Sequence, residues 1–319
     1  LNFNLFSVHK FFFLIKLLLL IKPDIIQTWL ILGDFIGGIA SRLAGFKNIV
    51  WNIRYSNFEI KRVKLFNFII IRLLSKLSYV VPKSIVVVSK KSKKLYEKKG
   101  YDKNKLQFIP NGYDLREIKK RKFKKLIKIK KNTPLVGYVA RYDPLKDHLN
   151  LLNALSLIKM KKINFYCLLI GYNIYNNKEI IKIIDKLKLT KNIKLLRPIK
   201  NVSKIMSSLD IHIQSSISEG FPNVVAEAMV QKTPCVVTNV GDSSYIVGKT
   251  GWVVPPASST KLARKIEIAI LEIGSKKWHK RCNQARLRIK EKFSISRMIR
   301  LYNKTWLKVY KSNDKKIIF

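Results

Sequence analysis

Paired cysteines, acidic residues and long apolar runs are scarce or absent in this 319-residue sequence. Its three cysteines, Cys167, Cys235 and Cys282, lie far apart, so their spacing indicates neither a disulfide framework nor a zinc site. A reducing, cytoplasmic location is therefore expected. The most apolar segment, residues 11–21, is shorter than the roughly 18–20 residues that span a bilayer, and Lys16 interrupts it. Because it also lacks a small-residue cleavage site, we expect a buried helix there and no signal peptide.

Acidic residues are too few to balance the basic ones. The sequence has 19 acidic and 64 basic residues, and its formal net charge is +45. A charge of this sign attracts polyanions, so nucleic acid and an anionic membrane surface are the candidate partners. No zinc-finger spacing or RNA-binding aromatic signature accompanies the charge, and we expect no nucleic-acid partner. Apart from a denser run at residues 119–131, the basic residues are spread along the chain, and we interpret most of the excess as an effect of AT-rich codons.

The alternative role for segment 11–21 is a helix that lies on a membrane surface. In that interpretation Lys10, Lys16 and Lys22 would sit at the level of the headgroups. The protein would then be peripheral at the inner face of the membrane.

Apolar segments typical of strands alternate with helical segments along the whole chain. This alternation predicts an α/β fold with parallel sheets that helices cover on both faces. We expect two Rossmann-like domains facing a crevice, at residues 1–118 and 119–290, and a helical tail at 291–319 with a break near residue 293. The expected strands lie at residues 25–29, 48–53, 84–88, 106–109, 135–140, 165–170, 193–196, 211–214, 235–238 and 251–254.

The segment after the expected strand 211–214 is the most informative, because ligands of open parallel sheets bind beyond the carboxyl ends of strands. Glu219 lies in this loop, where Gly220 permits tight backbone geometry and Pro222 suits a first helical turn. The helix that follows offers free N–H groups to an anion. Glu227 comes eight residues after Glu219, and carboxylates accept hydrogen bonds from sugar and ribose hydroxyls. By spacing alone, Glu219 could equally cap the helix and Glu227 could face solvent.

Two cations follow the expected strand 135–140. Arg141 comes directly after it and Lys146 five residues later. Cations at the carboxyl end of a strand can clamp a diphosphate. In a chain with so many cations, composition alone favours two ordinary surface charges.

Together these segments resemble the retaining glycosyltransferases of family 4, also called group 1, which have the GT-B fold. Residues 219–227 match the Glu-x7-Glu signature of that family within EGFPNVVAEAM, and TPCVVTNVG matches the segment after it. VARYDPLKDH resembles the diphosphate-clamp segment, IPNG the interdomain turn, and GWVVPPASSTKLARKI the closing strand and helix. The resemblance extends from about residue 17 to the end of the chain.

The resemblance implies a role for each matching residue. Arg141 and Lys146 would neutralise the leaving nucleoside diphosphate in place of a metal, Glu219 would contact the donor sugar, and Glu227 would bind the ribose hydroxyls. Neither a cofactor nor a metal is implied, and the nucleotide-sugar is a substrate. Transfer would retain configuration by a front-face displacement, since no carboxylate nucleophile is evident. The other donor-binding candidates are Gly137, Arg197, Gly220, Phe221, Pro222 and Asn223.

The first half of the chain resembles a subgroup that acts in surface polysaccharide synthesis, through WLILGDFIGG and WNIRYSN. We expect Asp34, Arg54, Ser56 and Asn111 on the acceptor side, although surface or capping roles fit them equally. Family members open with a strand, a Gly-rich loop and a helix that this sequence does not show, so we expect an N-terminal truncation. The predicted function is that of a hexosyltransferase, which moves a hexose or N-acetylhexosamine from a UDP-sugar to a lipid-linked or cell-surface glycan precursor, with a GDP-sugar as the less favoured donor. The alternatives are a decayed transferase that binds nucleotide without transfer, and a charge-driven polyanion binder.

Overall fold

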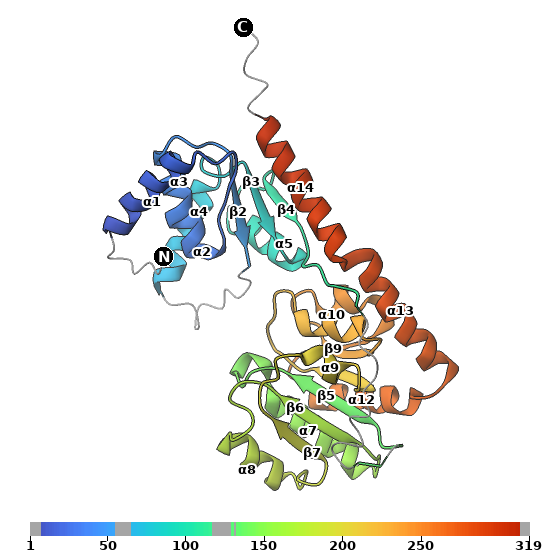
Figure 1. Ribbon diagram of the computed structural model, residues 1–319. Helices are drawn as coiled ribbons and strands as arrows, with labels where there is room; N and C mark the ends of the chain where they lie inside the picture. Colours follow the sequence, from blue (N-terminus) through green and yellow to red (C-terminus); the bar gives the residue numbers. More distant parts are fainter. Residues whose placement is uncertain (1–7, 55–64, 117–128, 131, 313–319) are drawn as a thin grey trace. The chain divides into compact units, whose positions relative to one another are not determined.

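The computed structural model describes residues 8–54, 65–116, 129–130 and 132–312. Contacts divide the chain into two compact units (Figure 1): unit 1 comprises residues 1–111 and 296–319, and unit 2 comprises residues 112–295. The division drawn from the sequence had its boundaries at residues 118 and 290 and set the tail apart. All ten predicted strands appear, each within two residues of its expected ends, and the α/β fold class is confirmed.

Unit 1 contains a four-stranded parallel sheet in the order β1-β2-β3-β4. Its strands are β1 (Ile26–Gln27), β2 (Ile49–Ile53), β3 (Ser84–Val87) and β4 (Leu106–Phe108). Its helices are α1 (Val8–Ile21), α2 (Leu30–Leu32), the π-helix η1 (Gly33–Gly37), α3 (Gly38–Leu43), α4 (Leu65–Leu77), α5 (Lys90–Lys98) and α14 (Ile295–Lys311).

The side chains of β2 show how this sheet is covered on both faces. Trp51 and Ile53 pack into a cluster that includes Leu74 of α4, whereas Val50 packs against Tyr302 of α14. Successive residues of a strand point to opposite faces, so the alternation places α4 and α14 on opposite sides of the sheet. The C-terminal helix therefore completes the core of unit 1.

Unit 2 contains a six-stranded parallel sheet in the order β10-β9-β8-β5-β6-β7. The chain builds outward from β5 through β6 and β7, then returns to the other side of β5 for β8, β9 and β10. The order reverses between β5 and β8, and such a switch point is where open α/β sheets bind ligands. The strands are β5 (Leu135–Val139), β6 (Tyr166–Ile170), β7 (Ile193–Leu196), β8 (Ile211–Gln214), β9 (Cys235–Thr238) and β10 (Trp252–Val254).

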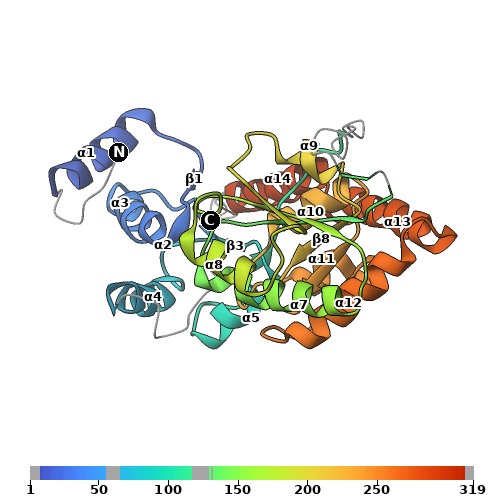
Figure 2. The same cartoon turned by 90° about the horizontal axis from the view of Figure 1, so that it is seen from below.

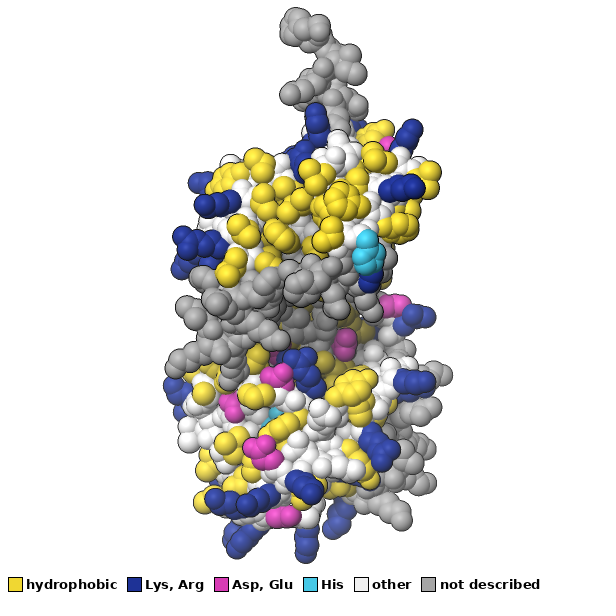
Figure 3. Space-filling model, turned by 90° about the vertical axis from the view of Figure 1, so that its left-hand side faces the viewer, with side chains coloured by type: hydrophobic (Ala, Val, Ile, Leu, Met, Phe, Trp, Pro, Cys, Tyr) yellow, Lys and Arg dark blue, Asp and Glu magenta, His cyan; other side chains and the backbone are white. Residues whose placement is uncertain are grey.

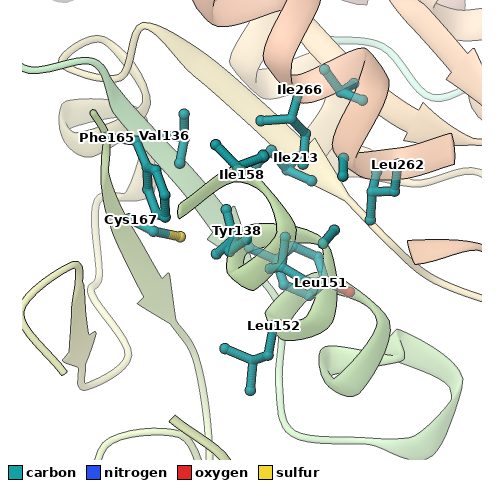
Figure 4. Packing of buried hydrophobic residues seen from close by; sticks show 14 of the residues in the cluster. Val136, Tyr138, Leu151, Leu152, Ile158, Phe165, Cys167, Ile213, Leu262 and Ile266 are labelled. Carbon is teal, nitrogen blue, oxygen red and sulfur yellow. The ribbon is translucent and has the colours of Figure 1, made fainter. Parts of the chain in front are cut away.

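Helices cover both faces of this second sheet. Helices α7 and α12 pack side by side (Figure 2) over a buried cluster that includes Tyr138, Leu151 and Ile266 (Figure 4), and α10 packs against α13. The predicted tail, residues 291–319, contains the end of α13 and the whole of α14, and the two helices are interrupted at Ser294. The remaining helical segments of unit 2 and their bounds are η2 (Pro144–Lys146), α7 (His148–Met160), α8 (Lys178–Lys186), α9 (Val202–Met206), α10 (Asn223–Val230), α11 (Ser243–Val247), η3 (Gly248–Thr250), α12 (Ser259–Glu272) and α13 (Lys276–Phe293).

The longest apolar stretch of the sequence forms the expected helix, α1, but the expectation that this helix is buried is wrong, since none of its residues is fully buried. Among the described residues, no helix combines the length and the apolar character needed to cross a membrane.

Candidate functional site

The two loops that leave the switch point of unit 2, residues 140–147 after β5 and 215–222 after β8, are joined by hydrogen bonds. The backbone N–H of Ile217 donates to the carbonyl of Leu145 at 2.9 Å. The carbonyl of Lys146 accepts from the Tyr138 hydroxyl at 2.6 Å and from Ser215 Oγ at 3.0 Å. Because Tyr138 and Ser215 are buried, these bonds fix the two loops on the core.

The side chains of Lys146 and Glu219 form an ion pair where these loops meet. Lys146 Nζ lies 2.5 Å from Glu219 Oε1, and the two side chains are 22% and 12% exposed. Ser216 Oγ donates to the same carboxylate oxygen at 2.7 Å. The cap position of α10 is Pro222, without a side-chain hydrogen bond, so Glu219 does not cap that helix. The structure therefore brings together two predicted residues that are 73 positions apart in the chain.

The short helix η2 sets the direction of Lys146. Asp143 caps it by accepting the N–H of Leu145 at 2.9 Å, and Pro144 occupies its first turn. Asp147 ends it with a left-handed backbone at φ 48° and caps α7 in turn, accepting the N–H of Asn150 at 3.2 Å. Lys146 thus lies between two capped turns, which restrict the directions its side chain can take.

Arg141, the other predicted cation, is on the surface. Its side chain is 63% exposed, and its Nη2 and Nε atoms lie 2.7 and 3.1 Å from Asp143 Oδ2. Burial alone would raise the pKa of Asp143, but the hydrogen bonds from Arg141 and Leu145 hold it below its usual value. Asp143 therefore contacts one cation of the expected clamp and positions the other.

Helix α10 begins directly after this loop, and Asn223 and Glu227 lie one helical turn apart on one of its faces. The hydroxyl of Tyr113 donates to Asn223 Oδ1 at 2.7 Å. Burial raises the pKa of Glu227. In the described part of the chain, no side chain hydrogen-bonds to the Glu227 carboxylate. A hydroxyl-bearing ligand on this face would find an acceptor, together with the first N–H groups of the helix.

The end of β9 and the turn after it contact the backbone of the Glu219 loop. Gly241 has φ +49°, and a Cβ there would overlap the carbonyl oxygens of Glu219 and Gly220. The N–H of Asp242 donates to the Gly220 carbonyl at 2.9 Å, and Thr238 Oγ1 donates to the Ser216 carbonyl at 2.6 Å. The sequence assigned no role to these residues, although the Thr-Asn-Val-Gly segment was part of the family resemblance.

Other predicted donor-site residues have identifiable local roles. Gly137 lies within β5, where a Cβ would come 2.5 Å from Leu209 Cδ1, so its lack of a side chain serves packing. Arg197 follows β7 with its guanidinium over the Tyr175 ring, 4.9 Å from the centroid. Phe221 is buried against Phe293.

Unit 1 brings two of the four predicted acceptor-side residues into contact. Arg54 Nη1 donates to Asn111 Oδ1 at 2.8 Å. Asp34 is instead 1% exposed, and its Oδ1 accepts from Thr28 Oγ1 at 2.5 Å and from the N–H of Asn52 at 3.4 Å. Burial raises the pKa of Asp34 to about 7.

The fourth acceptor-side candidate, Ser56, lies outside the described residues. Sequence reasoning missed Asn52, whose side chain hydrogen-bonds to Tyr302, a residue that is distant in sequence.

Comparisons with known proteins identify the family and the fold. Residues 119–288, just over half of the chain, match the family model of the glycosyl transferases group 1. The chain is 27% identical over 245 residues to the UDP-Gal:alpha-D-GlcNAc-diphosphoundecaprenol alpha-1,3-galactosyltransferase of Escherichia coli, covering 73% of this chain and 62% of that protein. It is 25% identical over 272 residues to the capsular polysaccharide biosynthesis glycosyltransferase CapM of Staphylococcus aureus, covering 80% of this chain and 70% of that protein.

Solved structures share the fold. A glycosyltransferase from Rickettsia africae superposes with a TM-score of 0.82 at 22% identity, covering 98% of this chain and 84% of that one. Anabaena Alr3699/HepE in complex with UDP-glucose gives a TM-score of 0.77 at 20% identity, covering 92% and 81%. The matched sequence segment spans less than two thirds of the Escherichia coli relative. With its two parallel α/β sheets and the family match over most of unit 2, the chain belongs to the group 1 glycosyltransferases.

Proposed function

We propose that this glycosyltransferase takes a sugar from a UDP-sugar and transfers it, with retention of configuration, to a lipid-linked or cell-surface glycan precursor. The observation that carries the proposal is the Lys146–Glu219 pair at the switch point of unit 2. The UDP and UDP-glucose complexes of the Anabaena protein support the donor, and the names of the two curated relatives support the acceptor class.

The donor diphosphate is assigned to Arg141, Lys146 and the first turn of α10. One hydrogen of the Lys146 ammonium points to Glu219, which leaves two donors for phosphate oxygens. Arg141 is exposed enough to turn from Asp143 toward a bound anion. The open N–H groups of α10 add partial positive charge. The second oxygen of Glu219 would accept from a sugar hydroxyl, and Glu227 from the ribose hydroxyls.

In the reaction, the bond between the anomeric carbon and the phosphate oxygen breaks, and its electron pair stays on the diphosphate. The acceptor hydroxyl forms the new bond on the same face of the sugar, and its proton goes to the departing phosphate oxygen. Negative charge on the diphosphate grows during this step. Fixed positive groups therefore stabilise the transition state more than the ground state, and no metal is required.

A thermal-shift titration with UDP, GDP and ADP tests the donor site. It is run at about 0.3 M salt, which screens weak anion binding by so basic a chain. We expect saturable stabilisation by UDP that is lost in Glu227→Ala and Arg141→Ala. The exposed residues Glu291 and Arg264 supply matched controls, Glu291→Ala and Arg264→Ala, which should respond like the wild type. Equal shifts with all three nucleotides, unchanged in every variant, would instead favour a polyanion binder.

If nucleotide binds but no sugar is transferred to any acceptor, the decayed-transferase alternative holds. Hydrolysis of UDP-glucose and UDP-N-acetylglucosamine, measured as release of UDP, separates an active transferase from a decayed one without requiring the natural acceptor.

We also propose that unit 1 contacts an anionic membrane surface. Apolar side chains gather over part of unit 1 (Figure 3), and Phe12 and Leu20 of α1 are 63% and 79% exposed. Such patches mark interaction surfaces, and the charge of +45 favours anionic lipid. Vesicles with phosphatidylglycerol should retain the protein better than neutral vesicles. The double variant Phe12→Ser, Leu20→Ser should lose this retention. The control is the double variant Met160→Ser, Leu271→Ser, which changes two comparably exposed residues of unit 2 and should keep it.

A further inference from the structure

Five side chains of unit 1, which we call the arginine cluster, form a continuous set of contacts. The guanidinium of Arg54 lies over the Trp29 ring, 4.6 Å from its centroid, and donates to Asn111 Oδ1 at 2.8 Å. The Trp29 ring stacks on Tyr302 with centroids 6.5 Å apart, and Asn52 Nδ2 donates to the Tyr302 hydroxyl at 2.6 Å. The cluster thus joins residues from β2, from the segments after β1 and β4, and from α14.

The position of Arg54 follows from the alternation of β2. Val50 packs against Tyr302, so Asn52 and Arg54, two and four residues further on, point to the same face of the sheet as Val50. Arg54 lies just beyond Ile53, the last residue of β2. It is therefore at the carboxyl edge of the sheet, the edge at which parallel sheets bind ligands.

The charge of Arg54 has no counterion among the described residues. Its contacts there are the Trp29 ring, the neutral amide of Asn111 and the Tyr302 hydroxyl, and its Nε atom is shielded from solvent without a hydrogen-bond partner. Asn52 Oδ1 is likewise buried without a partner in the described chain. The buried carboxyl of Asp34 is engaged by Thr28 and by the Asn52 backbone. A partly buried cation without a carboxylate among its described partners favours the binding of an anion.

A guanidinium suits a phosphate because its planar fork donates two parallel hydrogen bonds. Trp29 and Asn111 already hold that fork in place, so little side-chain entropy remains to be lost when an anion binds. We infer that Arg54 binds a phosphate group of the acceptor, the diphosphate that links its sugar to a lipid. This inference rests on the proposed function, in which the diphosphate of the donor occupies unit 2.

Calorimetric titration at about 0.3 M salt tests this assignment. The probes are N-acetylglucosamine diphosphate esterified with a short alkyl chain, the alkyl glycoside of the same sugar without the diphosphate, and UDP. Arg54→Gln should weaken binding of the diphosphate probe at least about tenfold and leave the other two unchanged. Arg72→Gln, which changes an exposed arginine on α4 of the same unit, should leave all three unchanged.

Trp29→Leu is the second variant, because it keeps the charge of Arg54 and removes the ring that orients it. We expect a smaller, severalfold loss of affinity for the diphosphate probe alone. Unchanged binding of that probe in both variants would overturn the inference. Weakened UDP binding with an unchanged diphosphate probe would assign Arg54 to the donor and would also overturn it. Failure of UDP to bind the wild type would count against the proposed function, and the diphosphate titration would still decide the role of Arg54.

Discussion

Both units place cations at the carboxyl ends of parallel strands, but they balance the charges differently. In unit 2, Lys146 contacts Glu219 and Arg141 contacts Asp143. In unit 1, Arg54 contacts the Trp29 ring, the Asn111 amide and the Tyr302 hydroxyl, and no described carboxylate pairs with it. A cation that is already paired with a carboxylate interacts most strongly with a ligand whose negative charge grows during the reaction. A cation with no carboxylate among its described partners attracts any anion whose charge stays constant through the reaction.

The difference fits separate functions for the two units, one for the leaving group and one for positioning the acceptor. The paired cations of unit 2 suit the leaving group, whose charge increases as the bond to the sugar breaks. The arginine cluster of unit 1 suits a phosphate that does not react. Binding of that phosphate would position the acceptor molecule that carries it. Variants that change one side of this comparison and spare the other are therefore the most informative.

The largest effect is expected from Lys146→Met. It removes a cation that the proposed function assigns to the leaving group and leaves Glu219 without its ion-pair partner, so sugar transfer should fall by about 100-fold or more. Lys161 forms a similar ion pair in the same unit, at 2.6 Å from Glu267, and Lys161→Met is the matched control. Turnover of UDP-sugar is the measurement. Similar rates for the two variants would show that Lys146 is only a structural partner of Glu219.

The next effect concerns the turn that supports the Glu219 loop. Gly241→Ala adds a Cβ against two carbonyl oxygens at a left-handed position, so we expect a loss of about 1–3 kcal/mol in stability and a displaced Glu219. Gly274 is also left-handed, at φ +83°, but has open space where a Cβ would be. Gly274→Ala therefore isolates backbone strain from steric overlap. Transfer should fall in Gly241→Ala alone, as measured by kcat/KM beside urea denaturation.

The sequence was sufficient for the sheets because each strand is a short apolar run with breaking residues at its ends. The short helix α11 was not predicted, since its five residues carry too little periodicity to be recognised. Arg141, Lys146, Glu219 and Glu227 were predicted as site residues because they match the family spacings, and their roles stay predictions. Which of them contact one another could not be predicted, because pairs such as Lys146 and Glu219, 73 positions apart, are brought together only by the fold. The predicted crevice between the units stays a prediction.

Asp34 provides a pH-dependent comparison between the units. Its pKa is raised by burial from 3.8 to about 7, so the folded state holds a proton that the unfolded state releases above pH 4. The contribution of this group to stability is therefore greatest below pH 4 and is lost as the pH rises toward 7. Asp34→Asn cannot ionise and should melt a few degrees above the wild type at pH 8. The gap should shrink steadily toward pH 4.

Tryptophan fluorescence during heating measures the effect of Asp34→Asn, since Trp29, Trp51 and Trp306 all lie in unit 1. Parallel stability curves for the two proteins across this pH range would contradict a raised pKa. Glu227→Gln makes the same comparison in unit 2, where burial also raises the pKa of Glu227.

The smallest effect is expected from Ser216→Ala, which removes one hydrogen bond to the Glu219 carboxylate and leaves its ion pair with Lys146 in place. A hydrogen bond to a charged group contributes about 1.5–3 kcal/mol, and the retained ion pair should keep the loss at the lower end of that range. Transfer should therefore fall about tenfold in Ser216→Ala, well short of the loss in Lys146→Met. Combining the two substitutions tests how Ser216 acts. If Ser216 only orients Glu219 toward Lys146, its removal should have little further effect once Lys146 is absent. The double variant should then be no slower than Lys146→Met, and a further tenfold loss would show that Ser216 contacts the substrate itself.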